Sequence, residues 1–340
     1  MADTFNYRID HHGSLVRPAG LTRPGDDPAA LDDAVEEAVA LQRRVRSTVV
    51  TDGDFPYEDF RGAVLGRVSG FRRTGGTGPG GLARWVAETL PKADAPLLAD
   101  RAARLAGLTV IAPKVSLPSP AYLAATTFDP SLAGSGGPAS ARELGEALAE
   151  IIQAEIELLV SRGVRLIQLN NPLLLGHLAA EPAVPDALSF EDTLAVEALA
   201  VRAQERPEGV RIGVCPGWEA PGTVDRSGAE RLYGGIPADR WILPYDRGTA
   251  AELDLLRALP EDRDVCLGVV DATTPELEEI DTVLVRIDAA AEVKDIEDMA
   301  LSPSRGFADL AARPFVGAEH QRRKLVLVET LARYCWGNEF

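Results

Sequence analysis

Residues 140–171 read SARELGEALAEIIQAEIELLVSRGVRLIQLNN. Through 140–163 the apolar side chains recur at i, i+3, i+4 and i+7 and leave a charged opposite face, which predicts an amphipathic helix. The run RLIQLNN at 165–171 is short and apolar before it ends in polar residues, which predicts a buried strand. A helix that leads directly into such a strand is the repeating unit of an α/β fold.

The same unit recurs along the whole chain. Helical periodicity also marks residues 27–46, 190–206, 274–293 and 321–336. Candidate strands lie at 7–13, 47–54, 109–116, 165–171, 211–217, 240–246, 264–271 and 298–306. Eight strands that alternate with helices predict one (β/α)8 barrel, a TIM barrel, over residues 1–340.

The chain is longer than the ~250 residues of a typical barrel, which predicts insertions. A glycine-rich stretch at 61–82 follows the second strand, and another at 126–140 follows the third. We expect both to be flexible loops on the face where barrel enzymes place their sites. The alternative fold is an open doubly wound sheet, but no GxGxxG follows the first strand and no P-loop is present.

The chain is acidic. It carries 35 Lys and Arg against 52 Asp and Glu, a formal net charge of −17. Such a surface repels phosphate and anionic lipid, which argues against nucleic-acid and membrane partners, although it also serves solubility alone. The start MADTFNYRIDHH lacks the regions of a signal peptide, and three cysteines without a CxxC pair fit a reducing compartment. We expect a cytoplasmic protein that binds a small molecule; its oligomeric state is left open.

Polar side chains stand at the ends of all eight candidate strands. Each alone is often a helix cap or a turn residue, but their recurrence favours a site because a purely structural barrel needs no polar groups on one face. These residues are His11, His12, Ser14, Asp52, Asp54, Lys114, Ser116, Asn170, Asn171, Cys215, Asp246, Asp271, Ser302 and Arg305.

The order of these motifs resembles the catalytic barrel of cobalamin-independent methionine synthases, especially the short single-barrel members and the related epoxyalkane:coenzyme M transferases. The matching stretches run over nearly the whole chain. They are HHGSLVRP (11–18), TDGDFP (51–56), PKVSLPSPAYL (113–123), IQLNNP (167–172), LPYDRGTAAELDLL (243–256), LGVVDATTPELE (267–278) and ALSPSRGFA (300–308). The resemblance implies a TIM barrel and a transferase that moves a methyl or alkyl group to or from a thiol.

The family uses a zinc ion that lowers the pKa of the acceptor thiol, held by the His and Cys of an HxC motif, a Glu and a final Cys. At these positions this chain has Gly213, Cys215, Pro244 and Arg305. Gly and Pro bring no donor side chain and Arg is a cation, so the resemblance predicts no family-type zinc site and no other cofactor. Folate binding is left open.

A metal site rebuilt from other groups would draw on His11, His12, Asp52, Asp54 and Cys215. Adjacent strand residues point to opposite faces, so at most one of the two histidines faces inward. Cys215 without a metal is a candidate nucleophile, or a small packed side chain.

The substrate-binding positions of the family are changed as well. Ser14 and the carboxylate of Asp54 remain, whereas Asn170 replaces an Asp that would pair with an ammonium group. Arg305 adds a guanidinium suited to carboxylate, sulfonate or phosphate. We therefore expect an anionic substrate, and we do not expect homocysteine to be the natural acceptor. Trp218 is a candidate stacking wall, or a packing residue under a loop; Lys114 and Asp246 are further candidates for substrate binding.

Three functions remain open. The first is a divergent methionine-synthase-like transferase. The second is a metal-free lyase or decarboxylase-type enzyme, as in the related uroporphyrinogen decarboxylase superfamily, with Arg305 as the electrophilic anchor and Asp54, His12 or Cys215 in proton transfer. The third is a catalytically silent binding barrel. For Arg305 we expect either an internal carboxylate partner, Asp54 or Asp246, or the substrate itself.

Overall fold

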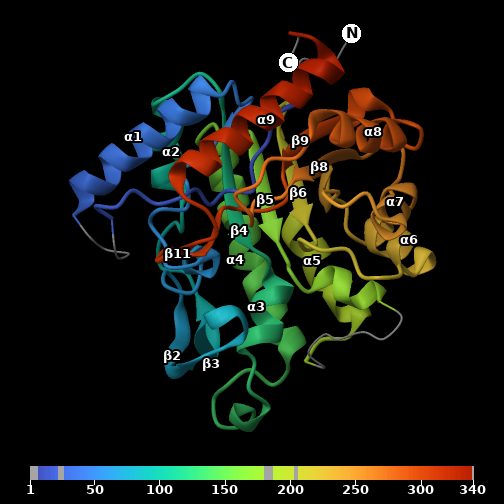
Figure 1. Ribbon diagram of the computed structural model, residues 1–340. Coiled ribbons are helices and arrows are strands. Elements are labelled where there is room, and N and C mark those ends of the chain that lie inside the picture. The colour runs from blue at the N-terminus through green and yellow to red at the C-terminus, as the bar shows by residue number, and fades with distance from the viewer. Residues whose placement is uncertain (1–6, 22–26, 180–186, 203–205, 339–340) are drawn as a thin grey trace.

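A curled sheet of seven parallel strands forms the centre of the computed structural model, which describes residues 7–21, 27–179, 187–202 and 206–338 (Figure 1). The strands lie in the order β1-β4-β5-β6-β7-β8-β9. Their bounds are β1 Val49–Val50, β4 Ala112–Pro118, β5 Leu166–Asn170, β6 Arg211–Cys215, β7 Arg240–Pro244, β8 Asp264–Val270 and β9 Met299–Pro303. Seven of the eight predicted strands are therefore present.

The remaining predicted strand lies between the two edges of this sheet. Ile9 forms a parallel bridge with Leu301 of β9, and the Asp10 backbone N–H donates to the Leu301 carbonyl at 2.9 Å. On the other side, the Thr48 N–H donates to the Ile9 carbonyl at 3.1 Å, next to β1. The segment around Ile9 thus touches both edges. The fold prediction is confirmed as far as a curled, parallel α/β sheet surrounded by helices.

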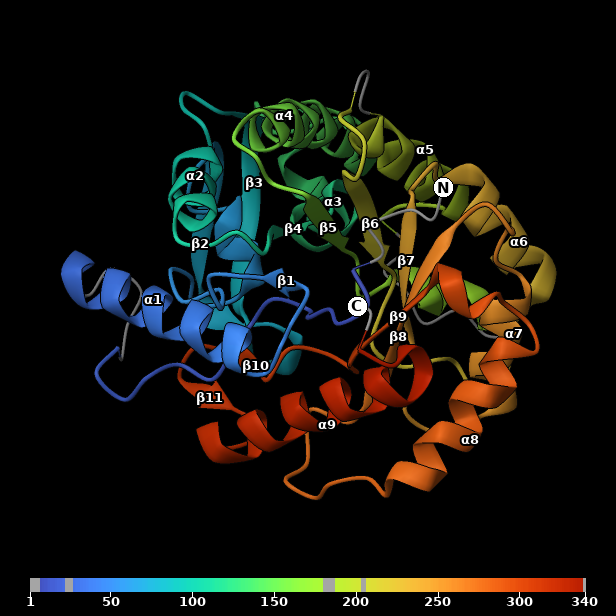
Figure 2. The same ribbon diagram turned by 90° about the horizontal axis from the view of Figure 1, so that it is seen from above.

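Helices cover the outside of the sheet, and Figure 2 shows most of them in a ring around the strands. Every residue of β5, β7 and β9 is buried, and so is every residue of β6 except Arg211, because the helices cover one face and side chains fill the other. The helices are α1 Pro28–Arg44, α2 Ala99–Gly107, α3 Pro120–Thr127, α4 Ala141–Ser161, α5 Phe190–Val201, α6 Arg226–Gly235, α7 Ala250–Arg257, α8 Ile280–Ala291 and α9 Ala318–Trp336.

The stretch predicted as a flexible loop after the second strand is instead part of an antiparallel hairpin. β2 (Ser69–Thr77) pairs with β3 (Ala83–Lys92), with Phe71 opposite Ala87 and Arg73 opposite Trp85. The glycines of 61–82 hide the alternation that marks a strand, and the pairing supplies the backbone hydrogen bonds that the local sequence does not indicate. The second predicted insertion, 126–140, begins in the last turn of α3 and leads to α4. It contains the short helix η3 (Pro130–Leu132) and an isolated bridge between Ala133 and Gly137.

Helix ends also differ from their predicted positions. α8 begins at Ile280, after the predicted start at 274, whereas α9 begins at Ala318, before the predicted 321. α5 ends at Val201, and residues 203–205 of the helix predicted over 190–206 lie outside the described part of the chain.

Buried charges tie distant elements together. α2 has no side-chain cap of its own, and Glu155 of α4 instead accepts the N–H groups of Leu97, Leu98 and Ala99 at 2.7 to 2.8 Å. Inside the sheet, the Lys114 ammonium lies 2.6 Å from a carboxylate oxygen of Asp10. Within the described residues we find no helix with the length and apolar character needed to cross a membrane.

Candidate functional site

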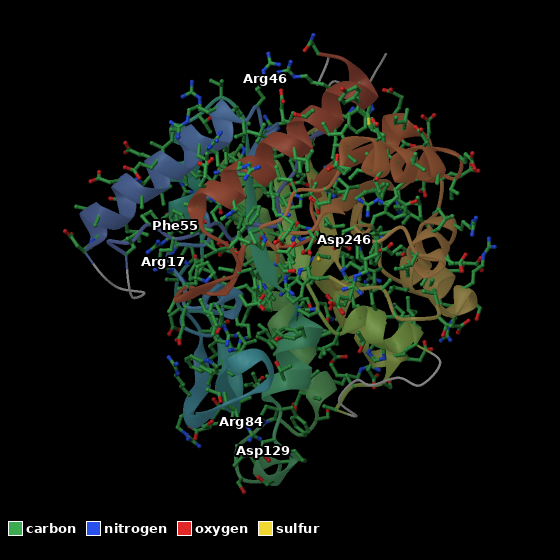
Figure 3. All side chains as sticks on the ribbon, viewed as in Figure 1. Arg17, Arg46, Phe55, Arg84, Asp129 and Asp246 are labelled. Atoms are coloured by element: carbon green, nitrogen blue, oxygen red, sulfur yellow. The ribbon has the colours of Figure 1, made fainter. Side chains whose placement is uncertain are left out.

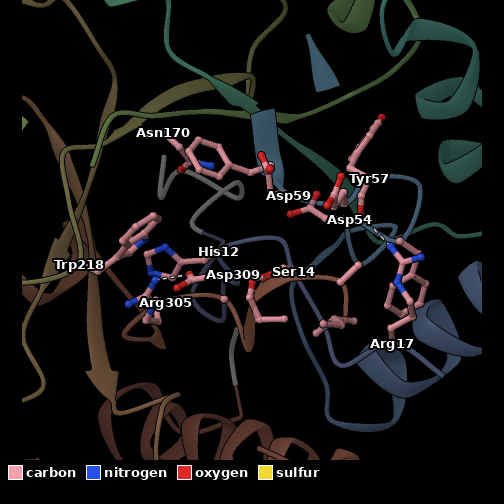
Figure 4. A pocket seen from close by; sticks show the side chains of 18 residues that line it. His12, Ser14, Arg17, Asp54, Tyr57, Asp59, Asn170, Trp218, Arg305 and Asp309 are labelled. Atoms are coloured by element: carbon pink, nitrogen blue, oxygen red, sulfur yellow. Dashed lines mark hydrogen bonds and ion pairs between the residues drawn. The ribbon is translucent and has the colours of Figure 1, made fainter. Parts of the chain in front are cut away.

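A cavity lies where the carboxyl ends of several strands meet (Figure 4). Five separate stretches of sequence reach it: the N-terminal segment, the loop after β1, the end of β5, the loop after β6 and the loop after β9. Its lining residues are His12, Ser14, Leu15, Arg17, Gly53, Asp54, Phe55, Tyr57, Glu58, Asp59, Phe60, Asn170, Trp218, Arg305, Gly306, Ala308, Asp309 and Ala311. We call this space the front cavity.

The loop after β1 is held rigidly against the N-terminal segment. The Thr51 hydroxyl donates to the Gly13 carbonyl at 3.1 Å, and the Gly53 N–H donates to the Thr51 hydroxyl at 3.2 Å. Gly13 has a φ of +124°, and a Cβ there would lie 2.8 Å from an Asp54 carboxylate oxygen. Only glycine therefore allows the two segments to approach this closely.

Asp54 lies in this loop with an unusual backbone. Its φ is +55°, a backbone conformation that residues other than glycine seldom adopt. Its N–H donates to an Asp52 carboxylate oxygen at 3.0 Å, which stabilises the turn. Burial, together with the neighbouring carboxyl of Asp52, raises the pKa of Asp54 to about 8. Asp54 is then mostly protonated at neutral pH and can donate a proton.

His12 and Cys215 form a buried pair at the cavity wall. The Cys215 sulfur lies 3.8 Å from His12 Nδ1, while within the described residues His12 Nε2 is buried and has no hydrogen-bond partner. Burial lowers the pKa of His12 to about 3 and raises the pKa of the Cys215 thiol to about 11. Both groups are therefore neutral near pH 7. Cys215 does not line the cavity, so the structure gives no support to a nucleophilic thiolate at this residue.

His11, by contrast, points away from the cavity. Its Nε2 lies 2.6 Å from the Ser47 hydroxyl, and burial lowers its pKa to about 4. His12 thus lines the front cavity and His11 does not, as expected for neighbouring residues that point to opposite sides.

Arg305 is held in the wall of the front cavity. Its guanidinium lies 4.3 Å from the centre of the Trp218 ring and 4.8 Å from the centre of the Phe315 ring. It forms an ion pair with Asp309, four residues along the chain (Figure 4). The prediction of Asp54 or Asp246 as the internal partner was therefore wrong. The reason is the short hairpin formed by β10 (Ala308–Leu310) and β11 (Arg313–Pro314), which brings Asp309 back over Arg305. Within the described residues Arg305 Nε has no hydrogen-bond partner.

Ser14 and Asn170, which were also predicted for the site, line the front cavity. The Ser14 hydroxyl donates to the Ala308 carbonyl at 2.9 Å and so fixes the loop after β9. Asn170 ends β5 and accepts a hydrogen bond from the Gln168 amide at 2.7 Å. The expectation that Trp218 forms a wall agrees with its position in the lining, where its ring also packs edge-on against Phe60.

Lys114 and Asp246, however, are not in the front cavity. Lys114 is 2% exposed, and its ammonium is bound to Asp10 and to the His11 carbonyl inside the sheet. Asp246 lines a neighbouring cavity. Figure 3 shows it away from Arg17 and Phe55, which line the front cavity. Trp218 and Arg305 line both spaces and form the wall between them.

Sequence reasoning missed several lining residues. Arg17, whose guanidinium donates to the Tyr57 carbonyl at 2.8 Å, belongs to the motif HHGSLVRP. Asp309 follows the motif ALSPSRGFA directly. A position in or directly after a motif was thus the signal by which the sequence could have indicated these two lining residues. Nothing in the local sequence showed that their side chains face the cavity.

The positions that hold zinc in the resembled family do not fit a metal here. Gly213 brings no donor side chain, and a Cβ there would make a tight contact of 3.0 Å with the end of the Ile242 side chain. The Arg305 guanidinium is fixed between two aromatic rings, at the position of the last ligand. Over residues 7–21, 27–179, 187–202 and 206–338, no three His, Cys, Asp or Glu side chains form a group that could hold a metal ion.

The chain matches no family model. It is 26% identical over 371 residues to YxjH of Bacillus subtilis (strain 168), an uncharacterized protein, and the match covers 97% of this chain and 95% of that protein. It is 28% identical over 216 residues to YxjG of the same organism, also an uncharacterized protein. This match covers 57% of this chain and 53% of that protein.

Solved structures show the same fold. One is the putative vitamin-B12-independent methionine synthase from Listeria monocytogenes, with a TM-score of 0.72 and 22% identity over 97% of this chain and 98% of that one. Another is a B12-independent methionine synthase from Shewanella sp. W3-18-1 in complex with selenomethionine, with a TM-score of 0.76, 16% identity and 97% of both chains covered. A methyltransferase from Methanosarcina mazei has a TM-score of 0.58 and 12% identity, and the match covers 97% of this chain and 94% of that one. The structural neighbours are therefore methionine-synthase-like proteins and methyltransferases.

Proposed function

We propose that the protein is a divergent methionine-synthase-like transferase that moves a methyl or alkyl group to or from a thiol without the family's zinc. The observation that carries this proposal is the convergence of motifs. Residues from HHGSLVRP, TDGDFP, IQLNNP and ALSPSRGFA, which are far apart in sequence, line one cavity at the carboxyl ends of the strands. That face is where barrel enzymes place their catalytic groups. We further propose that the segment around Ile9 is the first strand of a (β/α)8 barrel.

The chain's own residues suit a reaction that moves a proton and binds an anion. Asp54 holds a proton at neutral pH, and His12 Nε2 offers a buried, neutral partner to a bound molecule. The free Nε–H of Arg305 supplies a charged donor. Without a metal, a free thiol with pKa ~8.5 stays mostly protonated near pH 7. Removal of its proton therefore falls to the ionised form of Asp54, which is the minor form at that pH. Asn170 stands where the resembled family has an Asp, which removes one carboxylate partner for the ammonium group of homocysteine, so we do not propose homocysteine as the acceptor.

The proposal is tested by zinc analysis together with thiol alkylation assays. We expect purified protein to carry well under one equivalent of zinc and to retain alkyl transfer to an anionic thiol, such as a mercaptosulfonate, in the presence of a chelator. Stoichiometric zinc bound through Cys215, or methionine formation from homocysteine and methyltetrahydrofolate at a physiologically useful rate, would contradict it.

A second candidate function is a metal-free lyase or decarboxylase acting on a small anion. The protonated carboxyl of Asp54 and the guanidinium of Arg305 line the same cavity, and such a pair can protonate a carbanion and anchor its carboxylate. Release of carbon dioxide without any thiol present would favour this reaction over the transfer. A ligand that binds without being converted would instead indicate a binding barrel.

A further inference from the structure

Asp309 pairs with the guanidinium that the proposed anionic substrate needs. Arg305 and Asp309 both line the front cavity, and Arg305 Nη2 donates to one carboxylate oxygen, Oδ1, of Asp309 (Figure 4). Within the part of the chain that the structure describes, the Asp309 carboxylate has no second partner. A carboxylate of the protein itself therefore lies where a carboxylate or sulfonate of a ligand would bind.

This contact uses only part of the guanidinium. The Nε–H group and a terminal N–H group of an arginine form a fork that matches two oxygens of one anion. Asp309 pairs with Nη2, whereas Arg305 Nε is buried and, among the described residues, has no hydrogen-bond partner. An unpaired buried donor costs free energy. An anion whose two oxygens reach both nitrogens therefore gains a hydrogen bond that Asp309 does not make.

Arg305 is fixed more firmly than its partner. Its guanidinium lies 4.3 Å from the centre of the Trp218 ring and 4.8 Å from the centre of the Phe315 ring. Turning the guanidinium away would give up both of these cation–π contacts. The side chain of Arg305 is 17% exposed, against 31% for Asp309. When the ion pair opens, Asp309 is therefore the side chain that moves.

The backbone is anchored on both sides of Asp309, so its carboxylate can turn while the hairpin stays in place. The Ser14 hydroxyl donates to the Ala308 carbonyl at 2.9 Å, and the Ala311 N–H donates to a backbone carbonyl of the loop after β1 at 2.8 Å. Between these two anchors the pairing of β10 with β11 shifts register at Asp309. A bulge of this kind leaves one residue out of the ladder and aims its side chain elsewhere.

From this geometry we infer that Asp309 is a specificity-determining residue, which pairs with Arg305 until the anionic group of the substrate displaces it. A carboxylate or sulfonate displaces Asp309 because two of its oxygens pair with Nε and Nη2 together. A neutral group, or an anion that pairs with one nitrogen only, gains nothing over Asp309 and is not selected. The inference rests on the proposed function, because it concerns the anion that this function requires.

Calorimetric titration of the purified full chain with mercaptoethanesulfonate tests this inference. Asp309→Asn keeps the shape of the side chain and removes the internal competitor for Arg305. We expect this variant to bind the sulfonate about fivefold more tightly than the wild type does, which corresponds to the loss of one partly exposed ion pair. An unchanged or lower affinity in folded Asp309→Asn would overturn the inference.

Glu58→Gln is the matched control for the change in charge. Glu58 lines the same cavity but pairs with Arg73. Its substitution removes the same charge from the cavity without freeing Arg305, so we expect the affinity to change by less than about twofold. An equal gain in affinity in Glu58→Gln and Asp309→Asn would show a general effect of charge and would also overturn the inference.

A crystal structure of the wild type with mercaptoethanesulfonate keeps the test decisive if the variants fail to fold. We expect two sulfonate oxygens within hydrogen-bond distance of Arg305 Nε and Nη2, and the Asp309 carboxylate turned away. A sulfonate bound beside an intact pair of Arg305 and Asp309, or no sulfonate at Arg305, would overturn the inference. Neither experiment contains an alkyl donor. Sulfonate binding that displaces Asp309 without any alkyl transfer would therefore support the inference and contradict the transferase.

Discussion

Arg305 shows how one side chain can be both structural and available to a ligand. It is stacked between Trp218 and Phe315 and paired with Asp309, yet within the described residues its Nε has no partner. The side chains of Arg305 and Asp309 are 17% and 31% exposed. This ion pair is therefore intermediate between two kinds of pair. Exposed pairs contribute little to the free energy of unfolding, whereas breaking a buried pair lowers that free energy strongly.

At this scale we predict that Arg305→Met lowers the free energy of unfolding by about 1–2 kcal/mol, because Asp309 loses its cation in a partly buried place. The same change should abolish binding of small anions to the front cavity. Urea unfolding and calorimetric titration with a mercaptosulfonate measure the two effects separately.

Arg322→Met is the matched control. Arg322 is paired with Glu319 on the exposed face of α9 and should leave both stability and anion binding unchanged. Normal anion binding by folded Arg305→Met would remove this residue from the site.

At the scale of elements, buried carboxyls connect helices to strand ends. Glu197 of α5 accepts hydrogen bonds from the Ser119 hydroxyl at 2.5 Å and from the Asn171 amide at 2.6 Å. Ser119 is the N-cap of α3, and Asn171 follows β5, so one side chain links three elements beneath the front cavity. Burial raises the pKa of Glu197 from 4.5 to about 7, because no cation compensates it.

This raised pKa predicts a specific pH dependence of stability. The folded state binds the Glu197 proton more tightly than the unfolded state does, so stability falls as pH rises from about 4.5 through 7. The loss attributable to this group is about 3 kcal/mol in total. Glu197→Gln should remove that part of the pH dependence, as measured by urea unfolding at pH 5 and pH 8.

An exposed residue of α4 provides the comparison. Glu150→Gln should follow the wild-type pH profile, because this side chain is exposed to solvent. Identical pH profiles for the wild type and Glu197→Gln would show that Glu197 is ionised in the folded protein throughout this range.

At the scale of the whole molecule, the main feature is a group of buried charges inside the curled sheet. Asp10, 0% exposed, follows the segment that touches both sheet edges, and it pairs with Lys114 of β4 at 2.6 Å and Arg240 of β7 at 3.5 Å. Burial alone would raise the pKa of Asp10, but these two cations outweigh it and lower the pKa. One carboxylate therefore joins the N-terminal segment to strands on opposite parts of the sheet.

We predict that Asp10→Asn destabilises the fold by about 3–5 kcal/mol, since it leaves the Lys114 ammonium buried without its carboxylate. Chemical denaturation followed by circular dichroism measures this loss. Asp254→Asn, which breaks the exposed pair with Arg257, should cost less than about 1 kcal/mol. Equal effects of the two substitutions would mean that the interior pair does not hold the sheet together.

The sequence alone predicted the seven strands of the parallel sheet and most of the helices, because these depend on local periodicity and on the polar residues that follow buried runs. His12, Ser14, Asp54, Asn170, Trp218 and Arg305 were predicted for the site and line one cavity.

Only the tertiary structure decided which polar groups pair. It placed Lys114 inside the sheet and Asp246 in a separate space, and it gave Arg305 the partner Asp309. It also revealed the β2–β3 hairpin. Such pairings depend on the distances between side chains and on their burial, and both arise only when the chain packs. The type of a residue and its position in the sequence specify neither the distances nor the burial.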